Sequence, residues 1–110
     1  MSQFFPTAEE CSHRRIFPGV TIHACAADKM MLSHAVLEPN AVVEEHSHPH
    51  EQVGMMLEGR AIFYIGDEQR TLQPGDMYRI PGHVKHRVVA LADGARALDI
   101  FYPIREDYLQ

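Results

Sequence analysis

Short apolar segments separated by turn-forming residues run along most of the chain. Gly, Pro and Asp gather at intervals of roughly eight to twelve residues, a spacing typical of β-sandwiches and barrels. β-Branched and aromatic residues concentrate between these turns. They predict strands over five segments: 20–24, 30–37, 61–65, 84–91 and 97–102. No apolar pattern with a helical period is long enough to predict a helix of several turns, so the fold class expected is all-β.

The pair Asp93-Gly94 lies between two apolar stretches, 88–91 and 95–100. Asp-Gly favours a two-residue type I′ turn, because both central positions of that turn need a positive φ. The sequence therefore predicts a hairpin at this point.

The segment 61–65 is apolar on both of its faces, since Ile62 and Tyr64 alternate with Ala61 and Phe63. A strand that is apolar on both sides needs cover on its outer face as well as a core on its inner face. A second copy of the chain is the simplest cover, because most homo-oligomers are symmetric dimers. We therefore expect a homodimer.

The composition indicates one globular domain over residues 1–110. Hydrophobic residues make up 45% of the chain and charged residues 23%, and a chain of this length has room for one modest core. The net charge of −5 argues against a nucleic-acid partner, because a protein that binds nucleic acid presents a basic face to the phosphates.

The sequence also bears on location. No apolar run approaches the roughly 18 residues that cross a bilayer. The first fifteen residues have no apolar core of a secretory signal. We therefore expect no membrane partner and a cytoplasmic location, where Cys11 and Cys25 stay reduced.

The positions of the histidines indicate metal chemistry. His46, His48 and His50 alternate within five residues, and His83 and His86 follow later in the chain. Alternate residues of a strand share one face, so His46 and His48 can point at the same ion. His86 would join them from a distant strand. Imidazole is a common ligand of first-row transition metals.

Gln52 is the expected fourth ligand. Three imidazoles and one amide oxygen suit Ni, Zn, Fe or Mn better than Ca or Mg. A neutral amide leaves the charge of a divalent metal uncompensated, which favours polarisation of a carboxylate-bearing substrate over redox chemistry. Two alternatives stay open. A one-residue shift would make Glu51 the ligand, and His50, in the turn at Pro49, would orient the site or face solvent.

A second group of chemically active residues lies near the C-terminus. Asp99 and Phe101 share one face of the expected strand, and Leu98 and Ile100 share the other. A carboxylate inside a barrel is costly unless a cation lies nearby, and the metal and Arg105 would be such cations. The reverse orientation, with Asp99 in water, fits the pattern equally well.

Two motifs resemble those of the cupin family. The first is His-x-His, three or four residues, Glu or Gln, six residues and Gly, and the second is Gly, five residues, Pro, four residues and His. The chain has both, at His46, His48, Gln52 and Gly59, then at Gly75, Pro81 and His86. It departs from the family at His83, usually Gly, and at Ala90, usually Asn. The resemblance covers residues 41–90 and implies a cupin barrel, also called a jelly roll or double-stranded β-helix.

Residues 95–110 resemble one group of proteins within the cupin family. The run Asp-x-Phe-x-Pro-x-Arg-Glu-Asp-Tyr-Leu looks like that of small cupins from pectin and alginate breakdown, which open 4,5-unsaturated monouronates. Those proteins bind metal through His-x-His, Gln and His, and substrate through Asp, Phe and Arg. The resemblance implies these metal ligands and catalytic residues: His46, His48, Gln52 and His86, then Asp99, Phe101 and Arg105.

This resemblance implies a metal-dependent enzyme that opens a cyclic 4,5-unsaturated uronate, a small carboxylated sugar, to its linear keto form. Two alternatives stay open. One is a cupin dioxygenase with Fe at the same site, and the other is a protein that binds metal or sugar without turnover.

Overall fold

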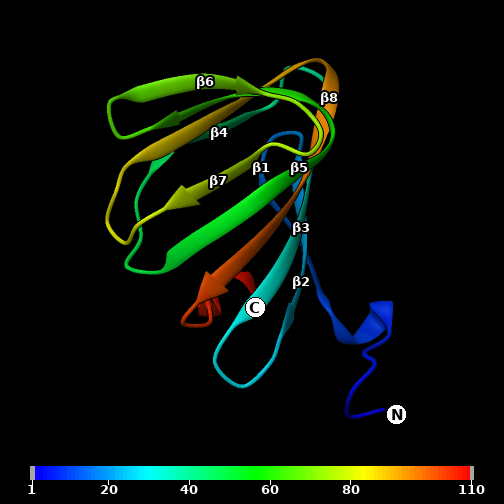
Figure 1. Ribbon diagram of the computed structural model, residues 1–110. Helices are drawn as coiled ribbons and strands as arrows, with labels where there is room; N and C mark the ends of the chain where they lie inside the picture. The colour runs from blue at the N-terminus through cyan, green and yellow to red at the C-terminus, as the bar shows by residue number, and fades with distance from the viewer. Residues whose placement is uncertain (1, 110) are drawn as a thin grey trace.

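Antiparallel strands make up most of the computed structural model (Figure 1). It describes residues 2–109, so the first and last residues of the expected 1–110 domain lie outside the described part. The elements follow in this order: η1 Ala8–Glu10, β1 Ser12–Phe17, β2 Val20–Ala26, β3 Met31–Leu37, β4 Val42–His46, β5 Glu51–Ile65, β6 Glu68–Leu72, β7 Met77–Ile80, β8 His86–Tyr102 and η2 Glu106–Tyr108. The prediction of an all-β fold is confirmed.

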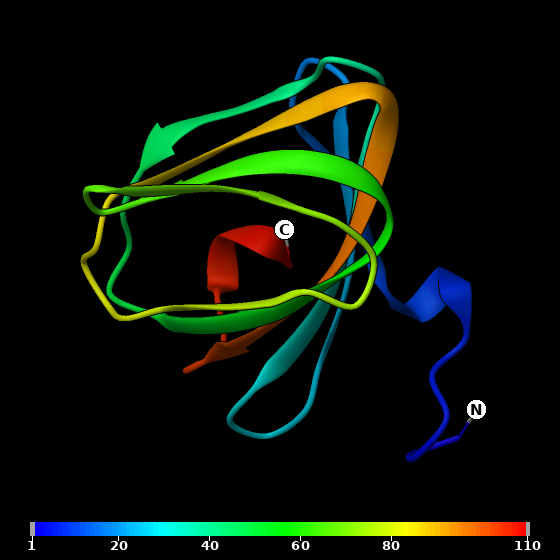
Figure 2. The same cartoon turned by 45° about the horizontal axis from the view of Figure 1, so that its top comes forward.

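The strands form two layers that share their two longest members, β5 and β8. One layer has the order β1-β2-β3-β8-β5-β7, and β4 and β6 pair with the other halves of β8 and β5. Figure 2 shows the two layers curving around the middle of the molecule. This arrangement is a jelly-roll barrel, in which a single strand can deliver side chains to both layers.

Two glycines allow β5 and β8 to pass from one layer to the other. Gly59 and Gly94 have φ values of +71° and +73°. A Cβ on Gly59 would lie 2.0 Å from the Gly94 carbonyl oxygen, and a Cβ on Gly94 would lie 2.7 Å from that of Leu37. Only residues without a side chain fit this close approach and this backbone conformation.

The prediction of a hairpin at Asp93-Gly94 is wrong. β8 runs through this pair without reversing direction, and both of its halves pair with β5. The positive φ of Gly94 therefore bends a continuous strand. The Asp-Gly pair correctly predicted a positive φ at Gly94, but a Gly with a positive φ can form a bend within a strand as well as a turn.

All five apolar segments overlap strands, although 84–91 begins two residues before β8 and 30–37 one residue before β3. Four strands were not predicted: β1, β4, β6 and β7. These strands are short, and most of their side chains are polar and face outward. In β6 only Leu72 is buried, and in β7 buried Tyr78 and Ile80 alternate with exposed residues. Strands that bury at most two residues carry little apolar signal.

Side chains from both layers meet in one core that includes Ile22, Met56 and Phe63. Five polar side chains are buried with them in the described part of the chain: Ser33, His48, Gln52, His86 and Asp99. Buried polar groups are costly unless they are paired or bind a ligand. Four of these five are residues that the sequence assigned to metal or substrate.

Two structural features concern the cysteines and the membrane. Cys11 and Cys25 are both free thiols. None of the helical segments in residues 2–109 is long and apolar enough to cross a membrane. The cytoplasmic location stays a prediction.

The bend at Gly94 generates a test of the fold. We expect Gly94→Ala to lower the free energy of unfolding by about 2 kcal/mol or more, because the methyl group meets the Leu37 carbonyl and the φ is unfavourable for Ala. Thermal and urea unfolding followed by circular dichroism measure this loss. Asp93→Ala, at the exposed neighbouring position, is the control and should cost much less. Equal stability of the two variants would contradict the role given to the bend.

Candidate metal and substrate site

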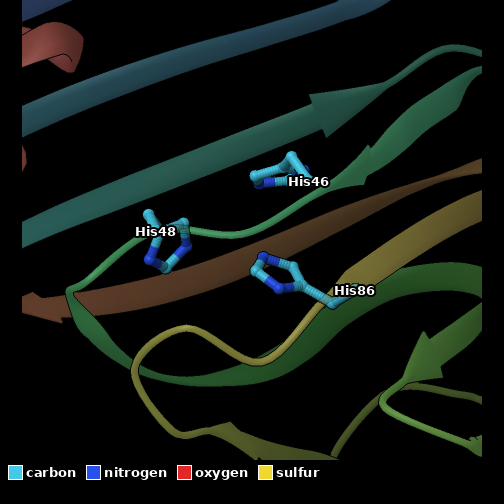
Figure 3. A group of neighbouring side chains, drawn as sticks. All are labelled: His46, His48 and His86. Atoms are coloured by element: carbon cyan, nitrogen blue, oxygen red, sulfur yellow. The ribbon is translucent and has the colours of Figure 1, made fainter.

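Three histidines converge between the two halves of the barrel. His46 ends β4, His86 begins β8 in register with it, and His48 lies in the loop that follows β4. One ring nitrogen from each lies within 4.8 Å of the others. Figure 3 shows the three rings gathered around one point. This is the arrangement that a transition metal needs from three imidazoles.

Backbone carbonyls fix the protonation of all three rings. Each Nδ1 donates a hydrogen bond to a carbonyl oxygen two residues away, in these pairs: His46 to Glu44 at 2.8 Å, His48 to His50 at 3.0 Å and His86 to Val84 at 2.8 Å. A carbonyl oxygen can only accept, so Nδ1 carries the proton and Nε2 keeps its lone pair for a ligand. Metal-binding histidines are oriented in this way in proteins.

The state of the rings at neutral pH also fits a metal. Burial, assisted by Arg105 and His86, lowers the pKa of His48 to about 4. Burial likewise lowers the pKa of His86. Both rings are therefore neutral at pH 7, which is the form that binds metal. The Nε2 atom of His86 is buried and has no hydrogen-bond partner among the described residues. A divalent metal would satisfy it.

Gln52 adds an oxygen to the same point. Its Nε2 donates to Oδ1 of Asp99 at 3.0 Å, which turns its Oε1 toward Nε2 of His48 at 3.2 Å. Since His48 holds its proton on Nδ1, two acceptor atoms face each other across this distance. A cation between them would turn the repulsion into attraction. Glu51, the alternative ligand, is exposed.

The structure decides the orientation of Asp99. The side chain points into the barrel and is 8% exposed. Its Oδ1 accepts hydrogen bonds from the Tyr78 hydroxyl at 2.5 Å and from Gln52 at 3.0 Å. Burial raises the pKa of Asp99, while these two bonds and the charge of Arg105 oppose the rise. The alternative with Asp99 in water is excluded.

Phe101 and Arg105 lie on the same side of the barrel. Phe101 is buried, and its ring packs edge-on against His48 with centroids 5.7 Å apart. The Arg105 guanidinium lies 4.0 Å above the Tyr108 ring, and its Nε donates to Asp107. One internal cavity is lined by the following site residues: His46, Gln52, Tyr78, His86, Asp99, Phe101, Arg105 and Tyr108.

His50 and His83, the other two histidines near the motifs, contact His48 through their backbone atoms. His50 supplies the carbonyl that orients His48, and its ring is outside the group of three. His83 is exposed and has a φ of +68°, a backbone conformation that favours Gly. Its N–H donates to the His48 carbonyl at 2.7 Å.

Two further residues of the site, Tyr78 and Tyr108, were not predicted from the sequence. Tyr78 lies on β7, a strand that was not predicted, and the position of Arg79 between Tyr78 and Ile80 was the available sequence signal. Tyr108 lies in η2 at the end of the tail, where its ring packs against Phe101 with centroids 5.6 Å apart. A short 3-10 turn has no periodic signal that would mark this residue as buried.

The site predicts a hierarchy of metal binding. We expect His86→Ala to lose most of the bound metal, because it removes one of three imidazoles. Gln52→Ala should retain the metal on three histidines with lower affinity. Calorimetric titration of the metal-free protein with Zn²⁺ or Ni²⁺ measures both effects. His13→Ala, an exposed histidine of β1, is the control. Unchanged affinity in His86→Ala would contradict this site.

Known proteins are similar to this chain in sequence and in fold. The chain is 31% identical over 84 residues to the pectin degradation protein KdgF of Dickeya dadantii, which covers 76% of both chains. The fold of this chain matches the structure of KdgF from Halomonas sp. with a TM-score of 0.83 and 29% identity, over 97% of this chain and 98% of the Halomonas chain. An RmlC-like cupin of Shewanella frigidimarina matches with a TM-score of 0.86 and 27% identity, over 97% and 96%.

The family assignment follows from sequence and fold together. Residues 33–101 match the family model described as a cupin domain, and this stretch contains both motifs found in the sequence. The three histidines positioned for a metal come from those motifs. The chain belongs to the cupin family, and it resembles the small cupins of pectin degradation.

Proposed function

We propose that this cupin is a metal-dependent enzyme that converts a cyclic 4,5-unsaturated uronate to its linear keto form. The observation that carries the proposal is the direct link between the metal site and a buried acid, because one amide group, that of Gln52, contacts both His48 and Asp99. Such a pair suits proton transfer on a substrate held at the metal. The similarity to proteins named for pectin degradation supports the choice of substrate.

The reaction needs a group that handles protons. In the substrate the ring oxygen is attached to the C4–C5 double bond, which makes an enol ether. C4 receives a proton and C5 receives the hydroxyl group of water, which gives a hemiketal. The hemiketal hydroxyl loses its proton as the bond between C5 and the ring oxygen breaks, and the ring oxygen stays on C1 and takes up a proton. The product is one open chain with a ketone at C5 and a hydrated aldehyde at C1.

Asp99 is the residue proposed to exchange this proton. Its Oδ1 is occupied by Tyr78 and Gln52, while Oδ2 has no hydrogen-bond partner in residues 2–109. Oδ2 is therefore the oxygen available to the substrate and to the attacking water. Proton transfer by a positioned side chain contributes about 10²- to 10⁴-fold to a rate.

Arg105 and Phe101 are proposed to bind the sugar. Asp107 occupies the Nε of Arg105, so the terminal nitrogens of the guanidinium are left to grip the substrate carboxylate as a planar fork. Phe101 forms an apolar wall beside His48. The aromatic ring of Tyr108 supports the guanidinium from one side.

The site residues fit a divalent metal, for which Ni, Zn, Fe and Mn are the choices that the ligands suggest. Such an ion, held by His46, His48, Gln52 and His86, would polarise the carboxylate and the neighbouring oxygen of the substrate. Gln52 adds no negative charge to this set, so the attraction for a carboxylate stays strong.

The first test separates chemistry from metal binding. Asp99→Asn retains shape and one hydrogen-bonding oxygen but cannot exchange a proton. We expect this variant to fold, to bind metal within a few-fold of the wild type and to open unsaturated galacturonate at least ~100-fold more slowly. The rate is followed by the loss of the ultraviolet absorbance of the double bond. Wild-type activity in Asp99→Asn would end this mechanism, whereas oxygen uptake by the Fe²⁺-loaded protein would favour a dioxygenase.

Arg105→Ala should act differently. The guanidinium contacts the carboxylate throughout the reaction, so its loss should raise KM much more than it lowers kcat. Steady-state kinetics of the metal-loaded variant measure the two constants. Arg79→Ala, an exposed arginine on β7, is the control. A fall in kcat with an unchanged KM would contradict the binding role.

We also propose that the protein is a homodimer, and the exposed side chains indicate the face. Ile62 and Tyr64 of the doubly apolar segment are half-buried, and Arg87 covers Tyr64. A row of exposed apolar side chains lies instead on the layer that contains β1, β2 and β3. In this row Ile100 of β8 is flanked by Leu32 of β3 and Val53 of β5. Exposed apolar patches of this kind mark interaction surfaces.

Light scattering tests the dimer. The wild type should have twice the mass of the chain at micromolar concentration, and Leu32→Glu should shift it toward the monomer, because a carboxylate is costly in an apolar interface. Thr71→Glu, on the exposed face of β6, should leave the mass unchanged. A wild-type monomer would contradict the proposal.

A further inference from the structure

The Tyr78 hydroxyl has no place in the reaction described so far, although it makes the shortest contact of Asp99. It donates to Oδ1 at 2.5 Å, and both side chains are buried. Hydrogen bonds to a carboxylate are roughly twice as strong as those between neutral groups. A bond of this kind, in the interior and directly beside the metal ligands, fixes the position of the acid.

The strand register explains how two side chains from separate strands meet. In the sheet β7-β5-β8, Tyr78 and Asp99 lie on either side of the same residue of β5, Gly54. A Cβ at this position would lie 2.3 Å from Cζ of Tyr78 and 2.6 Å from Oδ1 of Asp99. The absence of a side chain at position 54 therefore opens the path along which the hydroxyl reaches the carboxylate.

Packing holds the phenol in place without other polar contacts. Its ring lies against Phe63, with centroids 4.4 Å apart. The hydroxyl has Asp99 as its one hydrogen-bond partner in residues 2–109. The ring of Tyr78 is therefore part of the core, and its polar end contacts a single carboxylate oxygen.

We propose that Tyr78 is a positioning residue, which together with Gln52 holds Oδ1 of Asp99 so that Oδ2 is presented to the substrate. Two donors on one oxygen leave the carboxylate a single orientation. The inference rests on the proposed ring opening for its kinetic consequence, while the contact itself can be tested without turnover.

The kinetic test uses Tyr78→Phe, which removes only the hydroxyl. We expect kcat for unsaturated galacturonate to fall about tenfold or more, with KM and the affinity for Zn²⁺ within about twofold of the wild type. In the Asp99→Asn background the same change should have no further effect, because the group that it positions is already inactive. Tyr64→Phe, a tyrosine on the outer face of β5 next to Arg87, is the matched control. Equal losses in both backgrounds would overturn the proposal.

The contact test uses proton NMR of the Zn²⁺-loaded protein, a diamagnetic form. A buried hydroxyl bound to a carboxylate should give a slowly exchanging proton signal far downfield, absent from Tyr78→Phe and displaced in Asp99→Asn. A signal that Asp99→Asn leaves in place would overturn the proposal. If the wild type opens no unsaturated uronate but shows the signal, the proposed function fails and the positioning of Asp99 by Tyr78 stands.

Discussion

The site depends on the orientation of one amide group. Gln52 gives its nitrogen to Asp99 and its oxygen to the point where three imidazole lone pairs converge. Turning the amide over would set its oxygen against the carboxylate of Asp99, so the acid determines which atom faces the metal site. A Glu at this position would place a second carboxylate 3.0 Å from Asp99. The choice of Gln therefore follows from the neighbouring acid as much as from the metal.

The bent strands bring these groups together. Because β8 turns at Gly94, one strand supplies His86 from its first half and Asp99 and Phe101 from its second. β5 bends beside it at Gly59 and contributes Gln52 from the half that pairs with the second half of β8. Residues that are thirteen apart on one strand can then face the same cavity, which a flat strand would not permit.

Much of this arrangement follows from the sequence, and the exceptions have physical causes. The apolar segments predicted the all-β fold, because a strand's signal is local. The barrel and the metal-ligand set, with His86 from a distant strand, were implied by the resemblance to the cupin motifs. His46 and His48 do converge, although His48 lies in the loop after β4 and not on the strand. The direction of Asp99 could not be decided from the pattern, since Leu98 and Ile100 fill the opposite face equally well. The bend at Gly94 was mistaken for a turn, because both need a positive φ. Tyr78 escaped notice since its importance arises from a partner two strands away across Gly54.

The function that we propose for this cupin is the opening of a 4,5-unsaturated uronate at its metal site. The most direct measurement follows the ultraviolet absorbance of unsaturated galacturonate with chelator-treated protein, before and after one equivalent of divalent metal is restored. We expect the absorbance to decay only at the spontaneous rate without metal, and to decay with multiple turnovers once Ni²⁺, Zn²⁺, Fe²⁺ or Mn²⁺ is bound. Decay at the spontaneous rate with every one of these metals, in a protein shown by calorimetry to bind them, would contradict the proposed function.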